Sequence, residues 1–274
     1  MTSSEQEQLW NGPSGQAWVE SQELLDQVLA PFETLLVEAA TARAPRRLLD
    51  VGCGTGSTTL AVARRLGTGT RCVGLDISEP MLTLARMRAQ REGSRAEFIR
   101  ADAQTHAFEP ATVDMIVSRF GVMFFDDPVA AFANLRRAAT EDVALRLIAW
   151  RSAADNPFMT AAERAAAPLL PELPARNPDG PGQFAFGSAK RVHTILEESG
   201  WTGADVQPID VECAFPAGEL DAYITRLGPV GRLLQEADEP TRARVMQTIR
   251  PAFDPYLRGA EVRFVAACWM LSTG

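Results

Sequence analysis

The nine residues 48–56 (LLDVGCGTG) constrain the fold of this chain more than any other segment. An apolar stretch leads into a turn with glycine at every second position, Gly52, Gly54 and Gly56, and a helix is expected directly afterwards. Glycine is needed where φ is positive or where a ligand approaches the backbone closely. Free N–H groups at the start of the helix can bind a carboxylate or phosphate. The segment predicts a strand, a ligand-binding turn and a helix.

The rest of the chain continues this alternation, which predicts a parallel sheet with helices on both faces. Apolar periodicity predicts one long helical stretch at 14–44, divided in two by Pro31. Strands are expected at 46–51, 71–76, 97–100, 113–118, 143–150, 204–213 and 262–271, and further helices at 57–66, 79–92, 188–199, 219–235 and 239–249, with one more starting at Pro128.

These elements predict a single domain over residues 1–274, an α/β Rossmann-like, doubly wound, seven-stranded and mostly parallel sheet. Its expected parts are an N-terminal helical arm (1–45), a cofactor-binding core (46–150), a proline-rich cap insertion (151–188) and the C-terminal half of the sheet (189–274), which includes a helical lid insertion (217–257).

Charge and composition restrict the function. The chain has 27 Lys and Arg against 35 Asp and Glu, a net charge of −8, which disfavours nucleic-acid binding. No apolar run approaches the ~18 residues of a membrane helix, so no membrane insertion is expected. Residues 1–8 are polar and resemble neither a secretory signal nor a transit peptide. Four cysteines without a CxxC pair indicate free thiols in the cytoplasm.

Two ligand classes compete for the glycine turn. A dinucleotide fingerprint, G-x-G-x-x-G/A, would place Ser57 or Thr59 at its third position, where neither glycine nor alanine stands. The segment instead has Gly-x-Gly-x-Gly, with Asp50 two residues before the first glycine. A nicotinamide-dependent oxidoreductase is therefore disfavoured.

This arrangement resembles motif I of the class I S-adenosylmethionine-dependent methyltransferases. Three later segments agree in order and spacing: 73–78 (VGLDIS), 101–103 (ADA) and 113–118 (VDMIVS). The segments 10–18 (WNGPSGQAW), 118–125 (SRFGVMFF) and 184–187 (FAFG) are similar to a bacterial group that includes the ubiquinone/menaquinone-biosynthesis C-methyltransferases. The chain departs from this group at 140–142 (TED), where a Pro-Gly-Gly turn is usual. A local effect on stability is expected there.

The resemblance implies that S-adenosyl-L-methionine is the cofactor and S-adenosyl-L-homocysteine the product. Asp50 is expected to hold the cofactor ammonium or to cap the turn, Asp76 to accept hydrogen bonds from both ribose hydroxyls, and Asp102 to meet the adenine or to cap a strand end. The implied cofactor-binding set is Asp50, Gly52, Cys53, Gly54, Gly56, Ser57, Asp76, Ile77, Met81, Asp102, Ala103, Ser118 and Phe120.

The acceptor side is less specified by the sequence. Candidate substrate contacts are Trp10, Trp18, Arg119, Met123 and Phe124, with core packing as the alternative for the aromatic residues. Arg119 could anchor an anionic group or pair with an acid. Asp126-Asp127-Pro128 is explained by helix capping, so no metal is expected.

No dedicated general base is evident. His193, His106 and Arg119 are the only candidates for a catalytic side chain, and both histidines also suit a surface position. The expected function is methyl transfer to a small-molecule acceptor by a monomer or homodimer. Two alternatives remain: an S-adenosylmethionine-binding protein that transfers no methyl group, and a tRNA or protein methyltransferase.

Overall fold

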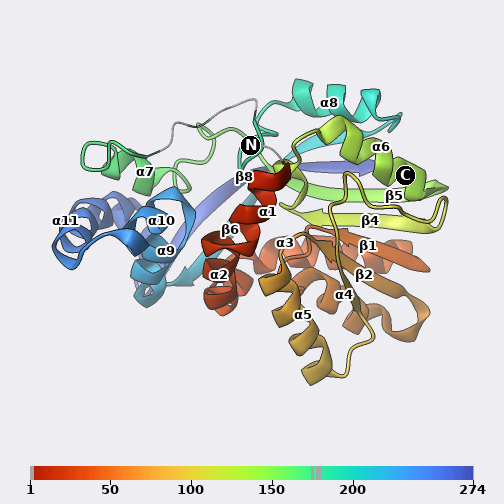
Figure 1. The fold of residues 1–274 in the computed structure, drawn as a ribbon, viewed down its shortest axis with the longest axis horizontal. Helices are drawn as coiled ribbons and strands as arrows, with labels where there is room; N and C mark the ends of the chain where they lie inside the picture. Colours follow the sequence, from red (N-terminus) through yellow and green to blue (C-terminus); the bar gives the residue numbers. More distant parts are fainter. Residues whose placement is uncertain (1–2, 174–175, 177–179, 274) are drawn as a thin grey trace.

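The computed structural model describes residues 3–173, 176 and 180–273, and it is built around one β-sheet (Figure 1). Seven strands follow one another in the order β3-β2-β1-β4-β5-β8-β6, and the short strand β7 pairs with β8 beside this path. The strands are β1 (Arg47–Val51), β2 (Arg71–Asp76), β3 (Glu97–Arg100), β4 (Val113–Arg119), β5 (Ala139–Trp150), β6 (Asp205–Pro216), β7 (Leu257–Arg258) and β8 (Glu261–Thr273).

Strand direction confirms the predicted doubly wound, mostly parallel sheet. Strands β1 to β5 run parallel to their neighbours, whereas β8 runs antiparallel to both β5 and β6. The strand order reverses between β1 and β4, which lie side by side. Open α/β sheets bind their ligands outside the carboxyl ends of the strands at such a reversal. The topology therefore places a site where β1 and β4 end.

The central strands are apolar on both faces because helices cover the sheet from both sides. Their buried residues include Leu48, Leu49, Val51, Met115, Ile116, Val117, Leu145, Leu147 and Ile148. The covering helices are α3 (Gln22–Arg43), α4 (Ser57–Leu66), α5 (Glu79–Glu92), α6 (Pro128–Ala138) and α8 (Ala189–Glu198). Helix α3 packs against α4, and α6 packs against α8 (Figure 1).

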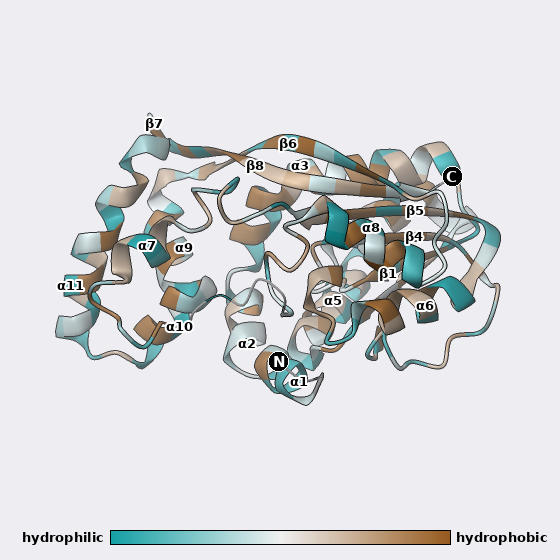
Figure 2. Cartoon of the chain, turned by 90° about the horizontal axis from the view of Figure 1, so that it is seen from above, coloured by the Kyte–Doolittle hydropathy of each residue, from teal (hydrophilic) through white to brown (hydrophobic). Residues whose placement is uncertain are grey.

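Two further groups of helices lie beyond the sheet. The arm begins with α1 (Ser3–Asn11) and α2 (Pro13–Glu20), which precede α3. The second group is α7 (Ala161–Ala166), α9 (Leu220–Arg226), α10 (Gly228–Glu236) and α11 (Glu239–Ile249). Figure 2 shows this second group at one end of the long strands β6 and β8, away from α6 and the C-terminus. Within the described residues, no helix combines the length and apolarity needed to cross a membrane.

The arm differs from its predicted form. Pro31 does not divide the helical stretch but lies inside α3, and the interruption falls at Ser21 instead. An internal proline costs one backbone hydrogen bond. Buried Val28 and Phe32 flank it and keep α3 packed on the core. Residues 3–11 also form a helix that the sequence did not predict.

The lid also differs from its predicted form. The helix expected over 219–235 is two helices, α9 and α10, separated at Leu227. Gly228 has a φ of +71° and precedes Pro229, and a residue before proline disfavours helical geometry. The cap between 151 and 188 contains one short helix, α7, and its residues 174–175 and 177–179 lie outside the described residues.

Asp127 Oδ1 accepts a hydrogen bond from Ala130 N at 2.9 Å at the start of α6, which confirms the interpretation of Asp126-Asp127-Pro128 as a helix cap.

Candidate active site

The turns after β1 and β4 pack directly against each other at the reversal of strand order. A Cβ atom on Gly52 would lie 2.5 Å from the Cα of Gly121, so neither position has room for a side chain there. Ser118 strengthens this junction: its hydroxyl donates to the carbonyl of Val51 at 2.6 Å and accepts from the N–H of Gly121 at 3.1 Å. The two turns therefore form one rigid floor beneath the site.

The three glycines of the turn have different structural roles, although all have positive φ. Gly56 packs against Phe98 and Ala85, and a Cβ there would lie 2.9 Å from each. Gly54 has a φ of +55°, and its only near neighbour would be Met81 Sδ at 3.7 Å. Gly54 therefore faces open space, and it lines a large cavity.

That cavity has a volume of about 1350 Å³ and is lined mainly by apolar residues. Eight of the thirteen predicted cofactor residues lie on its wall. These eight are Gly52, Gly54, Asp76, Ile77, Met81, Asp102, Ala103 and Phe120. The cofactor prediction from sequence therefore describes a set of residues that the fold brings to one surface.

Asp76 connects the ends of β1 and β2 at this wall. Its carboxylate accepts hydrogen bonds from Gly54 N at 2.8 Å and from Ser78 N at 2.9 Å. Burial raises the pKa of this carboxyl above its ordinary value, against the lowering effect of these N–H groups. Each carboxylate oxygen can accept more than one hydrogen bond, so Asp76 keeps capacity for a ligand in the cavity.

Asp50 lies behind the glycine turn and does not line the cavity. Its Oδ2 accepts a hydrogen bond from Thr59 Oγ1 at 2.6 Å, whereas its buried Oδ1 has no hydrogen-bond partner within the described part of the chain. Burial raises the pKa of Asp50 from 3.8 to about 6, although the hydrogen bond from Thr59 and the charge of Arg119 act in the opposite direction. A buried carboxylate with one unpaired oxygen favours a cationic partner.

This raised pKa predicts a specific pH dependence of stability. The folded state binds the Asp50 proton more tightly than the unfolded state, so stability falls as pH rises from about 4 to about 6 and then levels. Relative to Asp50→Asn, we expect the wild-type free energy of unfolding to drop by roughly 2 kcal/mol between pH 4 and pH 7. Urea titrations of both proteins at the two pH values measure this, and a constant difference would contradict it.

Other predicted cofactor residues support the turn from behind, and Cys53, Gly56, Ser57 and Ser118 do not line the cavity. The Ser57 hydroxyl donates to Glu33 of the arm helix α3. The Cys53 side chain lies in a small apolar cluster with Leu60, Leu82 and Phe98, and burial raises its thiol pKa well above the ordinary range. A buried neutral thiol is not a nucleophile.

Phe120 is the most strained residue of the wall. It has a φ of +65°, a region that bulky side chains rarely adopt. Its N–H donates to Ile148 O at 2.9 Å, and its ring stacks on Trp150 with centroids 4.4 Å apart and planes 9° apart. Such strain persists where the surroundings hold it, and it is concentrated at functional sites.

The predicted substrate residues Trp10, Trp18, Arg119, Met123 and Phe124 all line the same cavity. Trp10 makes edge contacts with Trp18 at 6.0 Å and with Phe124 at 5.2 Å between ring centroids. Ser78 Oγ donates to Trp10 O at 2.6 Å, and Asn11 bonds to Ile77 O and Glu79 N at 3.0 and 2.9 Å. The arm is thus fixed over the end of β2.

Arg119 stands among acids. The carboxylates of Glu33, Asp26 and Asp50 act on it electrostatically, although burial is the larger influence and lowers its pKa. Its Nη1 lies 3.5 Å from Leu29 O. The surroundings favour a charge-balancing role within the buried acids, the second of the two roles that the sequence left open.

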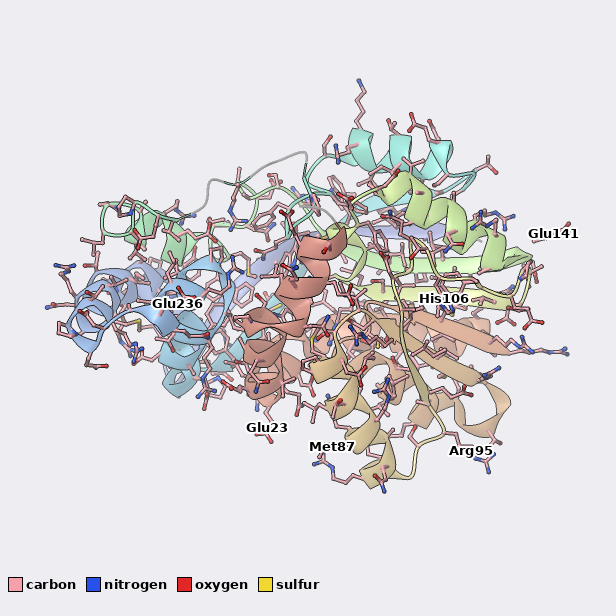
Figure 3. The ribbon with its side chains drawn as sticks, in the orientation of Figure 1. Glu23, Met87, Arg95, His106, Glu141 and Glu236 are labelled. Atoms are coloured by element: carbon pink, nitrogen blue, oxygen red, sulfur yellow. The ribbon has the colours of Figure 1, made fainter. Side chains whose placement is uncertain are left out.

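Neither histidine lines the cavity. His193 is half-buried on α8, and the face of that helix that meets the cavity carries Arg191, Thr194 and Glu198 instead. His106 is half-buried on the loop after β3 (Figure 3). It makes an edge contact with Phe108, 4.7 Å between ring centroids. Both predicted catalytic histidines therefore lie away from the wall of the candidate site.

The sequence predicted the cap and the lid as segments, but it identified none of the individual residues by which they line the cavity. This wall includes Phe158, Met159, Glu163, Tyr223, Ile224, Arg232, Phe253 and Phe264. These residues lie between 158 and 264 in the sequence and share no motif. The sequence predicted a helix over 219–235, but that pattern could not identify the cavity that the helices of this segment border.

The sheet and the helices that cover it form a Rossmann-like α/β fold. Residues 48–142 match the model of a methyltransferase domain family, and this match indicates S-adenosylmethionine as the cofactor. The residues present fit that cofactor: Gly54 opens the turn to the cavity, and the buried carboxyl of Asp50, with one oxygen unpaired among the described residues, lies behind the turn and suits a nearby ammonium group.

Known proteins resemble the chain in sequence and in structure. A demethylmenaquinone methyltransferase from Thermus thermophilus is 36% identical over 101 residues, 37% of this chain and 46% of that protein. The chain aligns with less than half the length of the first curated relatives it matches. The plantazolicin methyltransferase BpumL, solved with S-adenosylhomocysteine, has a TM-score of 0.51 at 12% identity over 98% of this chain and 94% of that one. The [4+2]-cyclase SpnF has a TM-score of 0.56 at 18% identity over 94% and 93%.

Proposed function

We propose that this protein transfers a methyl group from S-adenosylmethionine to a small molecule bound in the cavity. One observation supports this above all: the glycine turn and Asp76 share a single cavity with the apolar wall of the cap and lid. A volume of about 1350 Å³ leaves room for an acceptor beside the cofactor. The curated relative named above supports a small acceptor, and the charge of −8 disfavours nucleic acid.

The chain's own residues would hold both molecules. Asp76 accepts hydrogen bonds from the ribose, Asp102 lies where the adenine is expected, and Asp50 balances the ammonium from behind the turn. The cofactor, when bound, supplies an activated methyl group on a sulfonium. Orientation and exclusion of water are then the main tasks of the protein. Trp10 and Trp18 cover the site and exclude water, since the arm is bonded to the end of β2.

The wall offers few groups that could accept a proton from the acceptor. Beyond the cofactor residues, the carboxylates on the wall are those of Asp126, Glu163 and Glu198, and Tyr223 carries a hydroxyl whose pKa is raised by burial. Glu163 is bound by Arg176 in a fork with distances of 2.9 and 2.5 Å. An acceptor that is already nucleophilic, such as a phenolate, enolate, amine or thiol, suits this wall best.

Calorimetric titration with S-adenosylmethionine, S-adenosylhomocysteine and NAD tests the proposal first. We expect micromolar binding of both adenosyl ligands and no binding of NAD. An acceptor screen of phenols, quinols, amines and thiols, with S-adenosylhomocysteine release as the readout, then tests catalysis. Binding without turnover across the screen would favour a repurposed cofactor-binding protein. NAD binding alone would overturn the assignment.

A further inference from the structure

One part of the cavity wall comes from helices at the end of β6 and β8, and Figure 2 shows these helices away from α6 and the C-terminus. We call this part of the cavity the distal chamber and define it by Phe158, Glu163, Tyr223, Arg232, Phe253 and Phe264. These residues come from the loop before α7, from α7, α9 and α10, from the 3₁₀ segment Arg250–Tyr256, and from β8. None of them belongs to the expected cofactor-binding set.

The distal chamber has aromatic walls. Phe158 and Phe264 stack with centroids 3.8 Å apart and planes 7° apart. Tyr223 and Phe253 each approach Phe158 at 5.4 Å between centroids, in tilted and edge geometry. Aromatic rings pair with other rings in such stacked and edge arrangements. A planar aromatic molecule is therefore a complementary occupant.

The chamber also has an unmatched positive charge. Glu163 acts electrostatically on both Arg232 and Tyr223, but its two oxygens are already bound by Arg176. The half-buried Arg232 guanidinium makes no hydrogen bond or ion pair with any residue for which the structure gives a position. Tyr223 is neutral and directs its hydroxyl to Met159 Sδ at 3.6 Å. Two arginines therefore face one carboxylate in this chamber.

We propose that the distal chamber selects an acceptor that is a planar aromatic carboxylate, with the rings against the Phe158 wall and the carboxylate on Arg232. An arginine fork matches a carboxylate through two parallel N–H···O bonds, which lysine cannot reproduce. The inference rests on the proposed methyl transfer, since it names the class of acceptor. The selected group binds in the distal chamber, outside the expected cofactor-binding set, so it holds the acceptor and takes no part in the transfer.

Equilibrium binding of an isosteric pair of probes tests the proposal without turnover. 2-Naphthoate and 2-naphthamide share rings and shape but differ in charge. Quenching of tryptophan fluorescence can report their binding, since Trp10, Trp18 and Trp150 line the cavity. In the wild type, in the presence of S-adenosylhomocysteine, we expect naphthoate to bind at least tenfold more tightly than naphthamide.

Variants of one side chain then locate the preference. Arg232→Met should reduce naphthoate affinity by about 10- to 100-fold, the value of a charge-assisted hydrogen-bonded pair, and leave naphthamide unchanged. Arg232→Lys should recover part of the loss. Arg244→Met removes the same charge from an exposed position on α11 and should leave both affinities unchanged. Glu163→Gln removes the competing carboxylate and should tighten naphthoate binding.

Each outcome separates this inference from the proposed function. Equal binding of the two probes, or equal losses in Arg232→Met and Arg244→Met, would overturn the inference and show that Arg232 only balances Glu163. Failure of S-adenosylhomocysteine to bind, measured separately by calorimetry, would overturn the proposed function, while the naphthoate preference could still be measured.

Discussion

Gly54→Val is expected to abolish binding of S-adenosylmethionine, with an affinity loss of at least about 100-fold. Gly54 has a φ of +55°, which a β-branched residue adopts only at a cost of about 1–2 kcal/mol. Its added side chain would also occupy the cavity, because, apart from its chain neighbours, Met81 Sδ is the only atom of the described residues within 4 Å of the new Cβ. Calorimetry on the purified variant measures the loss.

Gly93→Val is the matched control. Gly93 ends helix α5 with a φ of +63°, has nothing within 4 Å of a Cβ, and does not line the cavity. It should show a similar loss of stability with unchanged affinity. Retained binding by Gly54→Val would mean that the turn does not contact the cofactor.

Asp76→Ala is expected to weaken cofactor binding by roughly 1–3 kcal/mol, the cost of losing charge-assisted hydrogen bonds. The structure adds a second contribution: the carboxylate also holds Gly54 N and Ser78 N, so its removal loosens the turn. Asp76→Asn keeps one acceptor oxygen and should lose less. Titration of each variant with S-adenosylhomocysteine gives the two affinities.

Asp127→Ala provides the comparison for Asp76→Ala. It removes a carboxylate that also accepts a backbone N–H, at the start of α6, but Asp127 does not line the cavity. This variant should lose about 1 kcal/mol of stability and no affinity. An unchanged affinity in Asp76→Ala would contradict the ribose role.

Most of the cofactor side was predictable because its signals are local. A turn that requires positive φ favours glycine, and buried parallel strands favour apolar runs. The strand and turn at 48–56 and the strand at 73–78 can therefore be recognised from the sequence. Helices α4, α5 and α11 and strands β2 and β3 lie at the predicted bounds. Strand β5 begins at Ala139 rather than at 143, because a register shift opposite β4 extends the pairing through polar residues.

Helix breaks were predicted wrongly at two proline positions, Pro31 and Pro229. Gly228-Pro229 marks the break between α9 and α10, whereas the apolar spacing on either side suggested one helix. Pro31 indicated a break that packing of α3 on the core overrides. In both cases the tendency of proline to break a helix opposed the burial of apolar side chains on one continuous helix. Which of the two effects is stronger depends on the packing of the folded core.

The sequence alone determined the strand–turn–helix unit, the acids at the ends of β1 and β2, and the class of cofactor, because these depend on backbone geometry within a few residues. The tertiary structure decided which residues share the cavity. It removed both histidines from the wall, placed Arg119 among acids and brought Arg232 to the aromatic chamber. Such groupings depend on contacts between residues far apart in the chain, and no local pattern encodes them.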